Sequence, residues 1–106
     1  MQERISRLMR ELKEALRQVY GENLRAVYLF GSYARGQEDP ESDVDVAIVL
    51  KDFTDYWQEV QRTGAIIAAL ALKYGVSVSP VRVREADWLQ GDAPFLNGLR
   101  KDCVLV

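Results

Sequence analysis

Two short strand-like segments constrain the fold of this chain more than any other feature: LRAVYLF at residues 24–30 and DVDVAIVL at residues 43–50. The first run is almost continuously apolar and is bounded by Gly21 and Gly31, which is typical of a buried strand. The second run alternates with period two, so one face of its strand carries Asp43, Asp45, Ala47 and Val49. The sequence therefore predicts two strands.

Helical patterns flank these strands. Residues 2–20 repeat apolar side chains with the spacing of one helical face: Ile5, Leu8, Met9, Leu12, Leu16 and Val19. A second helix is predicted over residues 55–74, where the apolar positions are Trp57, Val60, Ile67, Leu70, Ala71 and Tyr74. Thr54 or Asp52 is its expected N-cap, and Gly75 its expected end.

The remaining segments complete a mixed pattern of helices and strands. Residues 33–36 suit a short helical turn, and the acidic loop after it is broken by Pro40. VSVSPVRV predicts a third strand, in which Pro80 marks a bulge or an edge position.

The last segment of the chain, residues 92–106, predicts one more helix and a final edge strand. The helix covers residues 92–101, with Asp92 as cap and Pro94 in its first turn, and CVLV forms the strand. The expected fold is α/β (α+β), with a small mixed sheet of three or four strands flanked by helices in one domain, residues 1–106.

Composition excludes several kinds of chemistry. The 106 residues include no histidine and a single cysteine, Cys103, so neither a Ser-His-Asp triad nor a disulfide within the chain is available. Fourteen Lys and Arg against 16 Asp and Glu give a net charge of −2, which argues against direct nucleic-acid binding. Neither a signal peptide nor a membrane span is predicted, so we expect a cytoplasmic protein.

The residues able to bind a ligand or take part in catalysis lie close together if the first two strands are antiparallel. Gly31 and Ser32, at the end of the first strand, would then face Asp43 and Asp45 at the start of the second. A glycine turn with a following hydroxyl suits a phosphate group, and two neighbouring carboxylates suit Mg²⁺. Each part alone is more often an ordinary turn or a solvated strand end, but the combination is rare by chance.

GSYARG at residues 31–36, followed by SDVDVAIVL at residues 42–50, resembles the signature of the nucleotidyltransferase superfamily related to DNA polymerase beta. The resemblance is to the minimal, single-domain form and covers about residues 5–85. The G-S-x10-D-x-D spacing is similar to that of the antitoxins of HEPN/minimal-nucleotidyltransferase (MNT) pairs. The resemblance implies the nucleotidyltransferase fold.

The resemblance also implies residue roles. Gly31 and Ser32 would hold the triphosphate of an NTP, while Asp43 and Asp45 would be catalytic and ligate Mg²⁺. Arg35 would contact phosphate; the alternative is an ion pair with an acidic residue of the next loop.

One position departs from the family pattern. Catalytic members carry a third carboxylate on the following strand, where this chain has Ser77, with Ser79 next on that face. A hydroxyl replaces a carboxylate poorly as metal ligand and base. Glu85 or Asp87 would have to reach back from beyond the strand.

By resemblance, the chain is an Mg²⁺-dependent enzyme that transfers AMP from ATP, or NMP from another NTP, to a hydroxyl of a HEPN partner protein. One alternative is a catalytically impaired antitoxin or accessory subunit that neutralises its HEPN partner by binding. Another is a nucleotidyltransferase acting on small molecules. A homodimer is also compatible with the sequence.

Aromatic residues and the cysteine outside this motif have structural interpretations. We expect Tyr56, Trp57 and Tyr74 to pack in the core or an interface. Trp88 and Phe95 are predicted to be exposed and to suit a protein partner. Cys103 is expected to be a buried small apolar residue.

Overall fold

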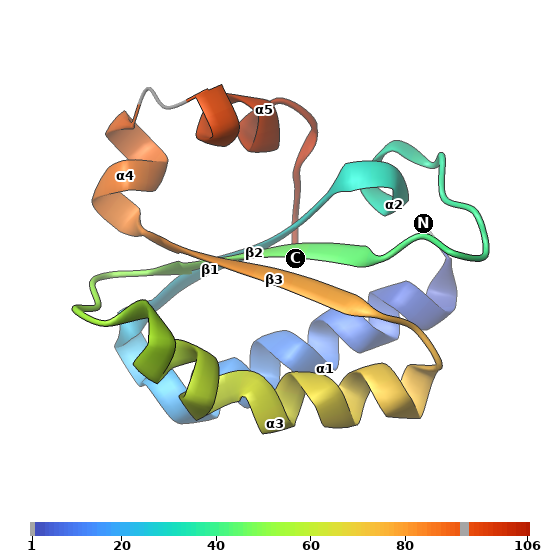
Figure 1. Cartoon of the computed structure of the whole chain (residues 1–106), viewed down its shortest axis with the longest axis horizontal. Helices are drawn as coiled ribbons and strands as arrows, with labels where there is room; N and C mark the ends of the chain where they lie inside the picture. The colour runs from blue at the N-terminus through green and yellow to red at the C-terminus, as the bar shows by residue number, and fades with distance from the viewer. Residues whose placement is uncertain (1, 92–93) are drawn as a thin grey trace.

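The computed structural model describes residues 2–91 and 94–106 (Figure 1). Its elements follow in this order: α1 (Glu3–Tyr20), the 3-10 helix η1 (Gly21–Asn23), β1 (Leu24–Phe30), α2 (Gly31–Arg35), β2 (Val44–Leu50), α3 (Tyr56–Tyr74), β3 (Val78–Arg84), α4 (Glu85–Gln90), α5 (Pro94–Asp102) and β4 (Val104–Leu105). The four strands form one mixed sheet in the order β3-β2-β1-β4. β1 is antiparallel to β2 and β4, and β3 is parallel to β2. The predicted mixed α+β fold is confirmed.

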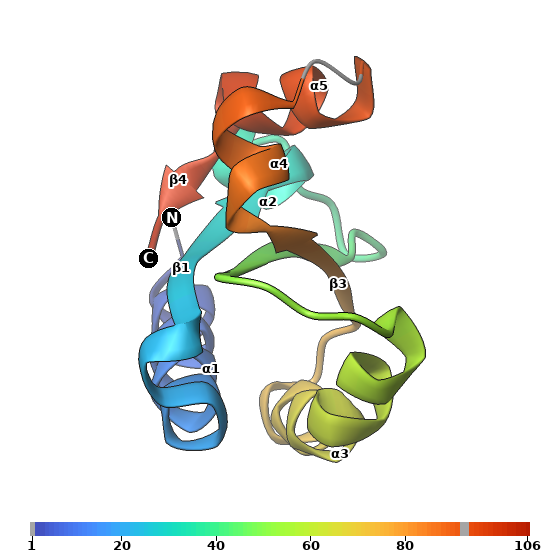
Figure 2. The same ribbon diagram turned by 90° about the vertical axis from the view of Figure 1, so that its left-hand side faces the viewer.

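Helices cover both faces of this sheet. α1 and α3 lie against one face, while α4 and α5 lie over the other (Figures 1 and 2). The period-two alternation of β2 distributes its side chains between two apolar clusters. Val44, Val46, Ile48 and Leu50 join the cluster under α1 and α3, whereas Ala47 and Val49 join the cluster under α4 and α5. β2 is therefore buried on both faces, as suits a strand in the interior of a sheet.

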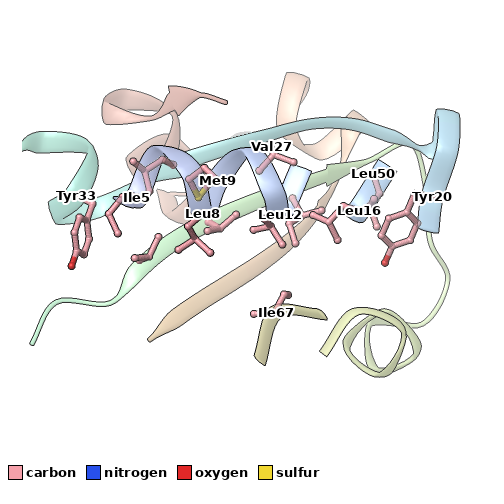
Figure 3. Close-up of a cluster of buried hydrophobic side chains, with 14 residues drawn as sticks. Ile5, Leu8, Met9, Leu12, Leu16, Tyr20, Val27, Tyr33, Leu50 and Ile67 are labelled. Atoms are coloured by element: carbon pink, nitrogen blue, oxygen red, sulfur yellow. The ribbon is translucent and has the colours of Figure 1, made fainter. Parts of the chain in front are cut away.

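α1 supplies much of the larger cluster (Figure 3). The predicted face is buried at five of its six positions: Ile5, Leu8, Met9, Leu12 and Leu16. The sixth prediction is wrong, because Val19 is 38% exposed and Tyr20 is the buried residue at this end of the helix. Full burial of each such aliphatic side chain contributes about 1.5–3 kcal/mol, so this cluster holds α1 against the sheet.

α3 begins one residue later than expected, and its N-cap differs from both candidates. The Asp55 carboxylate accepts a hydrogen bond from the backbone N–H of Trp57 at 3.0 Å, so Asp55 is the cap. Asp52 instead forms an ion pair with Arg84 at 3.2 Å. Trp57 is 63% exposed, which rules it out as a core residue. The helix ends at Gly75 as predicted, with φ of +65°.

β3 is an edge strand, and its register with β2 runs without interruption from Val44↔Val78 to Leu50↔Arg84. Pro80 therefore occupies an edge position and makes no bulge. This placement suits a residue that has no N–H to donate.

The chain after β3 contains two helices where the sequence predicted one. α4 follows β3 directly, and the prediction that Trp88 is exposed is wrong, because this residue is only 7% exposed. Its ring stacks on Tyr28 of β1 with centroids 4.7 Å apart. The exposure of Phe95 is confirmed at 58%. The proposed cap Asp92 lies outside the described residues.

The last described residues form the predicted edge strand. β4 pairs with β1 through Tyr28↔Leu105 and Leu29↔Val104. Cys103 is partly buried against the smaller cluster, and this burial raises the pKa of its thiol. Over residues 2–91 and 94–106, each helix is either too short or too polar to cross a membrane.

Candidate active site

The antiparallel register of β1 and β2 brings the two predicted halves of the site together. Phe30, the last residue of β1, pairs with Asp45 near the start of β2. The Gly31-Ser32 turn follows directly, so it lies beside the acidic end of β2. The strands are antiparallel, so the Gly31-Ser32 turn and the acidic pair lie close together, as the sequence predicted for that arrangement.

Gly31 is in direct contact with the Asp45 carboxylate. A Cβ atom built on Gly31 would lie 2.2 Å from Asp45 Oδ2 and 3.1 Å from Asp45 Cγ. Gly31 also has φ of +74°, a conformation that L residues rarely adopt. Two separate physical reasons, backbone conformation and lack of space, thus require glycine at this position.

The short helix α2 holds this turn in place. Tyr33 is buried in the cluster under α1 and fixes the helix to the core (Figure 3). Gly36 ends α2 in the left-handed conformation, with φ of +68°, and the N–H of Gln37 donates to the carbonyl of Ser32 at 2.9 Å. The backbone around Ser32 is therefore closed into a compact turn.

The electrostatics of the site centre on Asp45. Burial raises the pKa of the Asp45 carboxyl, and the negative charge of Asp43 raises this pKa further. The positive charge of Arg35 acts in the opposite direction. The two carboxylates thus lie close enough to repel each other, and a bound cation would relieve that repulsion.

Arg35 keeps its guanidinium exposed beside this pair. Its Nε donates to Gln37 Oε1 at 3.1 Å. Within the described residues, no ion pair joins Arg35 to the loop acids Glu38, Asp39 and Glu41. The alternative role predicted for Arg35 is therefore not realised in this structure, and its charge remains available to an anion.

Two serines lie beside the acidic pair, one in the adjacent strand β3 and one just before it. Ser79 of β3 pairs with Asp45, and Ser77 precedes it, with its carbonyl accepting from the N–H of Val44 at 2.8 Å. Both serines are exposed. No cluster of three or more Asp, Glu, His or Cys residues suited to a metal occurs in the part of the chain that the structure describes. The site thus offers two carboxylates and two neighbouring hydroxyls.

A cavity of about 940 Å³ opens next to this end of the sheet. Its walls include Tyr33 of α2, Ser42 of the acidic loop, Leu72 of α3 and Ser77 just before β3. Asp43 and Asp45 are not part of its lining, so it adjoins the acidic pair without containing it.

Sequence reasoning treated Asp43 and Asp45 alike, whereas the structure separates them. Asp45 is partly buried against Gly31, and Asp43 is exposed. The structure also places Ser79, not Ser77, directly across from Asp45. Only the register between strands carries this information, and no local signal in the sequence specifies it.

A glycine-serine turn that closes one strand and faces an acidic pair on the antiparallel neighbour, in a mixed sheet flanked by helices, is typical of nucleotidyl-transferring domains. Comparison with known families agrees with that class. Residues 9–99 match the family model described as "Nucleotidyltransferase domain". The chain belongs to this family, and its class of activity is nucleotidyl transfer.

Individual relatives support the assignment. The chain is 39% identical over 77 residues to the "Putative protein adenylyltransferase MJ0141" of Methanocaldococcus jannaschii, which covers 73% of this chain and 77% of that protein. It is similar in structure to a "putative nucleotidyltransferase" from Sulfolobus solfataricus, with a TM-score of 0.59, 25% identity and coverage of 99% and 86% of the two chains.

A third similarity is to a chain in the complex of a tri-AMPylated HEPN toxin with an MNT antitoxin from Shewanella oneidensis. The TM-score is 0.61 at 20% identity, and the match covers 94% of this chain and 69% of that one. At this identity, the likeness shows the fold alone.

Proposed function

We propose that this chain transfers the AMP group of ATP to a hydroxyl of a partner protein and releases pyrophosphate. The observation that carries the proposal is the contact between the Asp45 carboxylate and Gly31, with Asp43 and Arg35 close enough to influence the charge of Asp45. This arrangement combines a place for phosphate with a place for a cation, which nucleotidyl transfer requires.

The residues of the turn would bind the triphosphate. Gly31 has no side chain, so the backbone can approach phosphate oxygens closely, and the Ser32 hydroxyl adds a donor. The exposed guanidinium of Arg35 would donate two parallel hydrogen bonds to a phosphate. Together these groups would orient the nucleotide so that its α-phosphorus faces the acceptor.

Asp43 and Asp45 would hold Mg²⁺. Burial and then the negative charge of Asp43 raise the pKa of Asp45, which fits a site that a cation completes. Mg²⁺ commonly binds one or two carboxylates together with substrate phosphates. When bound, the ion stabilises negative charge on the attacked phosphate and on the departing pyrophosphate. The acceptor oxygen bonds to the α-phosphorus, the bond from that phosphorus to the bridging oxygen breaks, and the hydroxyl proton is released.

We propose a HEPN-domain protein in the cytoplasm as the acceptor. Two comparisons support this choice: the relative named as a protein adenylyltransferase, and the structural neighbour found in a complex with an AMPylated HEPN toxin. The cavity beside the acidic pair leaves room for a protruding segment of such a partner.

A second candidate function is neutralisation of the partner by binding alone. It is favoured by the two serines beside Asp43 and Asp45, where catalytic members have a third carboxylate, and by the lack of a larger acidic cluster among the described residues. In that case the fold would serve as a binding module.

Transfer of label from [α-³²P]ATP separates these functions. The protein is incubated with ATP, Mg²⁺ and the product of the neighbouring reading frame, and compared with the variants Asp43→Asn and Asp45→Asn. Asp52→Asn is a matched control, because Asp52 follows the opposite end of β2. Catalysis predicts label on the partner that both site variants lose and the control retains.

Other results contradict the proposal. The binding function is correct if the parent protein transfers no label and if Asp43→Asn and Asp45→Asn neutralise the partner as well as the parent does. Label that accumulates on a low-mass acceptor without any partner protein would identify a small-molecule nucleotidyltransferase.

A further inference from the structure

One side of α3 is exposed, uncharged and apolar at both ends. α3 lies at the outside of the molecule, beside α1 (Figure 2). Its two ends on this side are Trp57, which is 63% exposed, and Leu72, which is 85% exposed. The residues of this side, here named the α3 face, follow helical spacing and are Trp57, Gln61, Gly64, Ala65, Ala68 and Leu72. All except the half-buried Gly64 are exposed.

The charged residues of α3 lie outside this face and have partners within the chain. Glu59 is buried and pairs with Arg62 at 3.3 Å, and Lys73 pairs with Glu11 of α1 at 2.9 Å. A helix side turned to solvent normally carries charged and polar residues. The α3 face is therefore typical of a surface that another protein covers.

The core of the chain does not use the two large residues of this face. Among the described residues, neither Trp57 nor Leu72 belongs to either apolar cluster. The sequence assigned Trp57 to the core or to an interface, and its exposure leaves the interface. Association with a second surface would remove both side chains from water.

The order of residues along the α3 face is complementary to itself in an antiparallel arrangement. Trp57 and Leu72 are equally far from the midpoint between Gly64 and Ala65. A two-fold axis at this midpoint would set Trp57 of each copy against Leu72 of the other, which is how a symmetric dimer uses one patch twice. The small residues between them let the two helices approach closely.

The charges at the edge of the face favour the same arrangement. Asp55, the N-cap of α3, and Lys73, in its last turn, lie about five helical turns apart and therefore along the same edge. In an antiparallel pair, Asp55 of one copy lies opposite Lys73 of the other, and the helix dipoles oppose each other favourably. A parallel pair would bring like charges together at both ends.

The size of the face fits a weak dimer. Fifteen residues of helix span about 22 Å. Burying the exposed side chains along this length in both copies would cover on the order of 1,200 Å² in total, the lower end of the range for specific interfaces. Such a dimer is reversible, so the monomer dominates in dilute solution.

We propose that two copies of this chain associate through the α3 face in an antiparallel, two-fold dimer. Leu72 also lines the cavity of about 940 Å³ next to the acidic pair, so the dimer brings Trp57 of the second copy to the edge of that cavity. The association does not depend on nucleotidyl transfer, because it involves none of the residues that would bind ATP or Mg²⁺.

Sedimentation equilibrium of the whole chain tests the association. We expect a monomer at about 5 µM and a predominant dimer near about 1 mM. Leu72→Glu should weaken association at least about tenfold, because it places a charge in the apolar interface. Leu89→Glu is the matched control, since Leu89 is a 69% exposed residue of α4 outside the face, and it should leave association unchanged. Both substitutions are at the surface, so the fold is retained.

Disulfide cross-linking tests the antiparallel geometry, in a Cys103→Ser background. Gln61 and Ala68 are equally far from the proposed axis, so Gln61→Cys and Ala68→Cys should link to each other when the two variants are mixed. Neither should link to itself, because about 10 Å along the helix separates each residue from its own copy.

Three results overturn the proposal. The first is a monomer at about 1 mM, or equal association of Leu72→Glu and Leu89→Glu. The second is self-linking of each cysteine variant, which would indicate parallel helices. The third is association that occurs only with the product of the neighbouring reading frame, which would assign the α3 face to a different protein.

Discussion

The carboxylate of Asp45 lies so close to Gly31 that a methyl group on residue 31 would overlap Asp45 Oδ2, at 2.2 Å. The glycine that shapes the candidate phosphate turn therefore also sets the position of a candidate metal ligand. Any change at Gly31 must move the turn, the carboxylate or both.

Substitution of Gly31 should damage activity far more than stability. Gly31→Ala and Gly36→Ala both place a side chain at positive φ, which costs about 1–2 kcal/mol in each case. Only Gly31→Ala displaces Asp45, because the space around Gly36 is open to 4 Å. We expect Gly31→Ala to lose about 100-fold in AMP transfer, and Gly36→Ala to retain most of it.

Urea unfolding and label transfer measure the two effects of these substitutions separately. Equal losses of transfer in the two variants would show that backbone strain, and not the contact with Asp45, is responsible.

A third carboxylate beside Asp45 should strengthen metal binding. Ser79 pairs directly with Asp45, so Ser79→Asp is expected to raise the affinity for Mn²⁺, used as a paramagnetic probe in place of Mg²⁺, by about tenfold. Without metal, the same variant should be less stable than the parent, since it adds a like charge. Ser77→Asp tests the neighbouring position, and a larger gain there would assign the third-ligand role to residue 77.

Stability at high pH should depend on Tyr20. Burial and a hydrogen bond to Glu59 raise the pKa of the Tyr20 hydroxyl to about 12, whereas an unfolded tyrosine ionises near pH 10. Between these values the unfolded chain has released a proton that the folded chain retains, so the free energy of unfolding falls as pH rises. The contribution of Tyr20 to stability is complete below pH 10 and is lost toward pH 12.

Denaturant unfolding across this range checks the sign of the effect. Tyr20→Phe should show a shallower fall in stability above pH 10 than the parent protein. A parallel fall in both proteins would assign the pH dependence to other groups.

The two tryptophans should differ sharply in their effect on stability. Trp88 is buried and stacked on Tyr28, so Trp88→Ala should cost about 3–5 kcal/mol in the free energy of unfolding. Trp57 is mostly exposed, and Trp57→Ala should change it by less than about 0.5 kcal/mol. Thermal and urea unfolding measure both effects. Similar losses of stability in the two variants would contradict the structure.

Elements with strong periodicity were predictable from the sequence. The helix over residues 2–20 and the strand over residues 24–30 agree with α1 and β1 to within one residue. α4 was missed because its six residues make less than two turns, which is too short for a helical period to emerge. Trp88 was misplaced for the same reason: its burial depends on Tyr28, a residue 60 positions away in the chain.

The sequence by itself determined the chemistry that this protein has available: no imidazole, two acidic residues at the start of a strand, and a glycine-serine turn at a fixed distance before them. These properties are local, since they depend on residue type and spacing along the chain. The tertiary structure decided which groups meet. It set Asp45 against Gly31, aligned Ser79 with Asp45, and stacked Trp88 on Tyr28. Strand register and helix packing establish such contacts, and they arise from cooperative burial over the whole fold, which no short segment encodes.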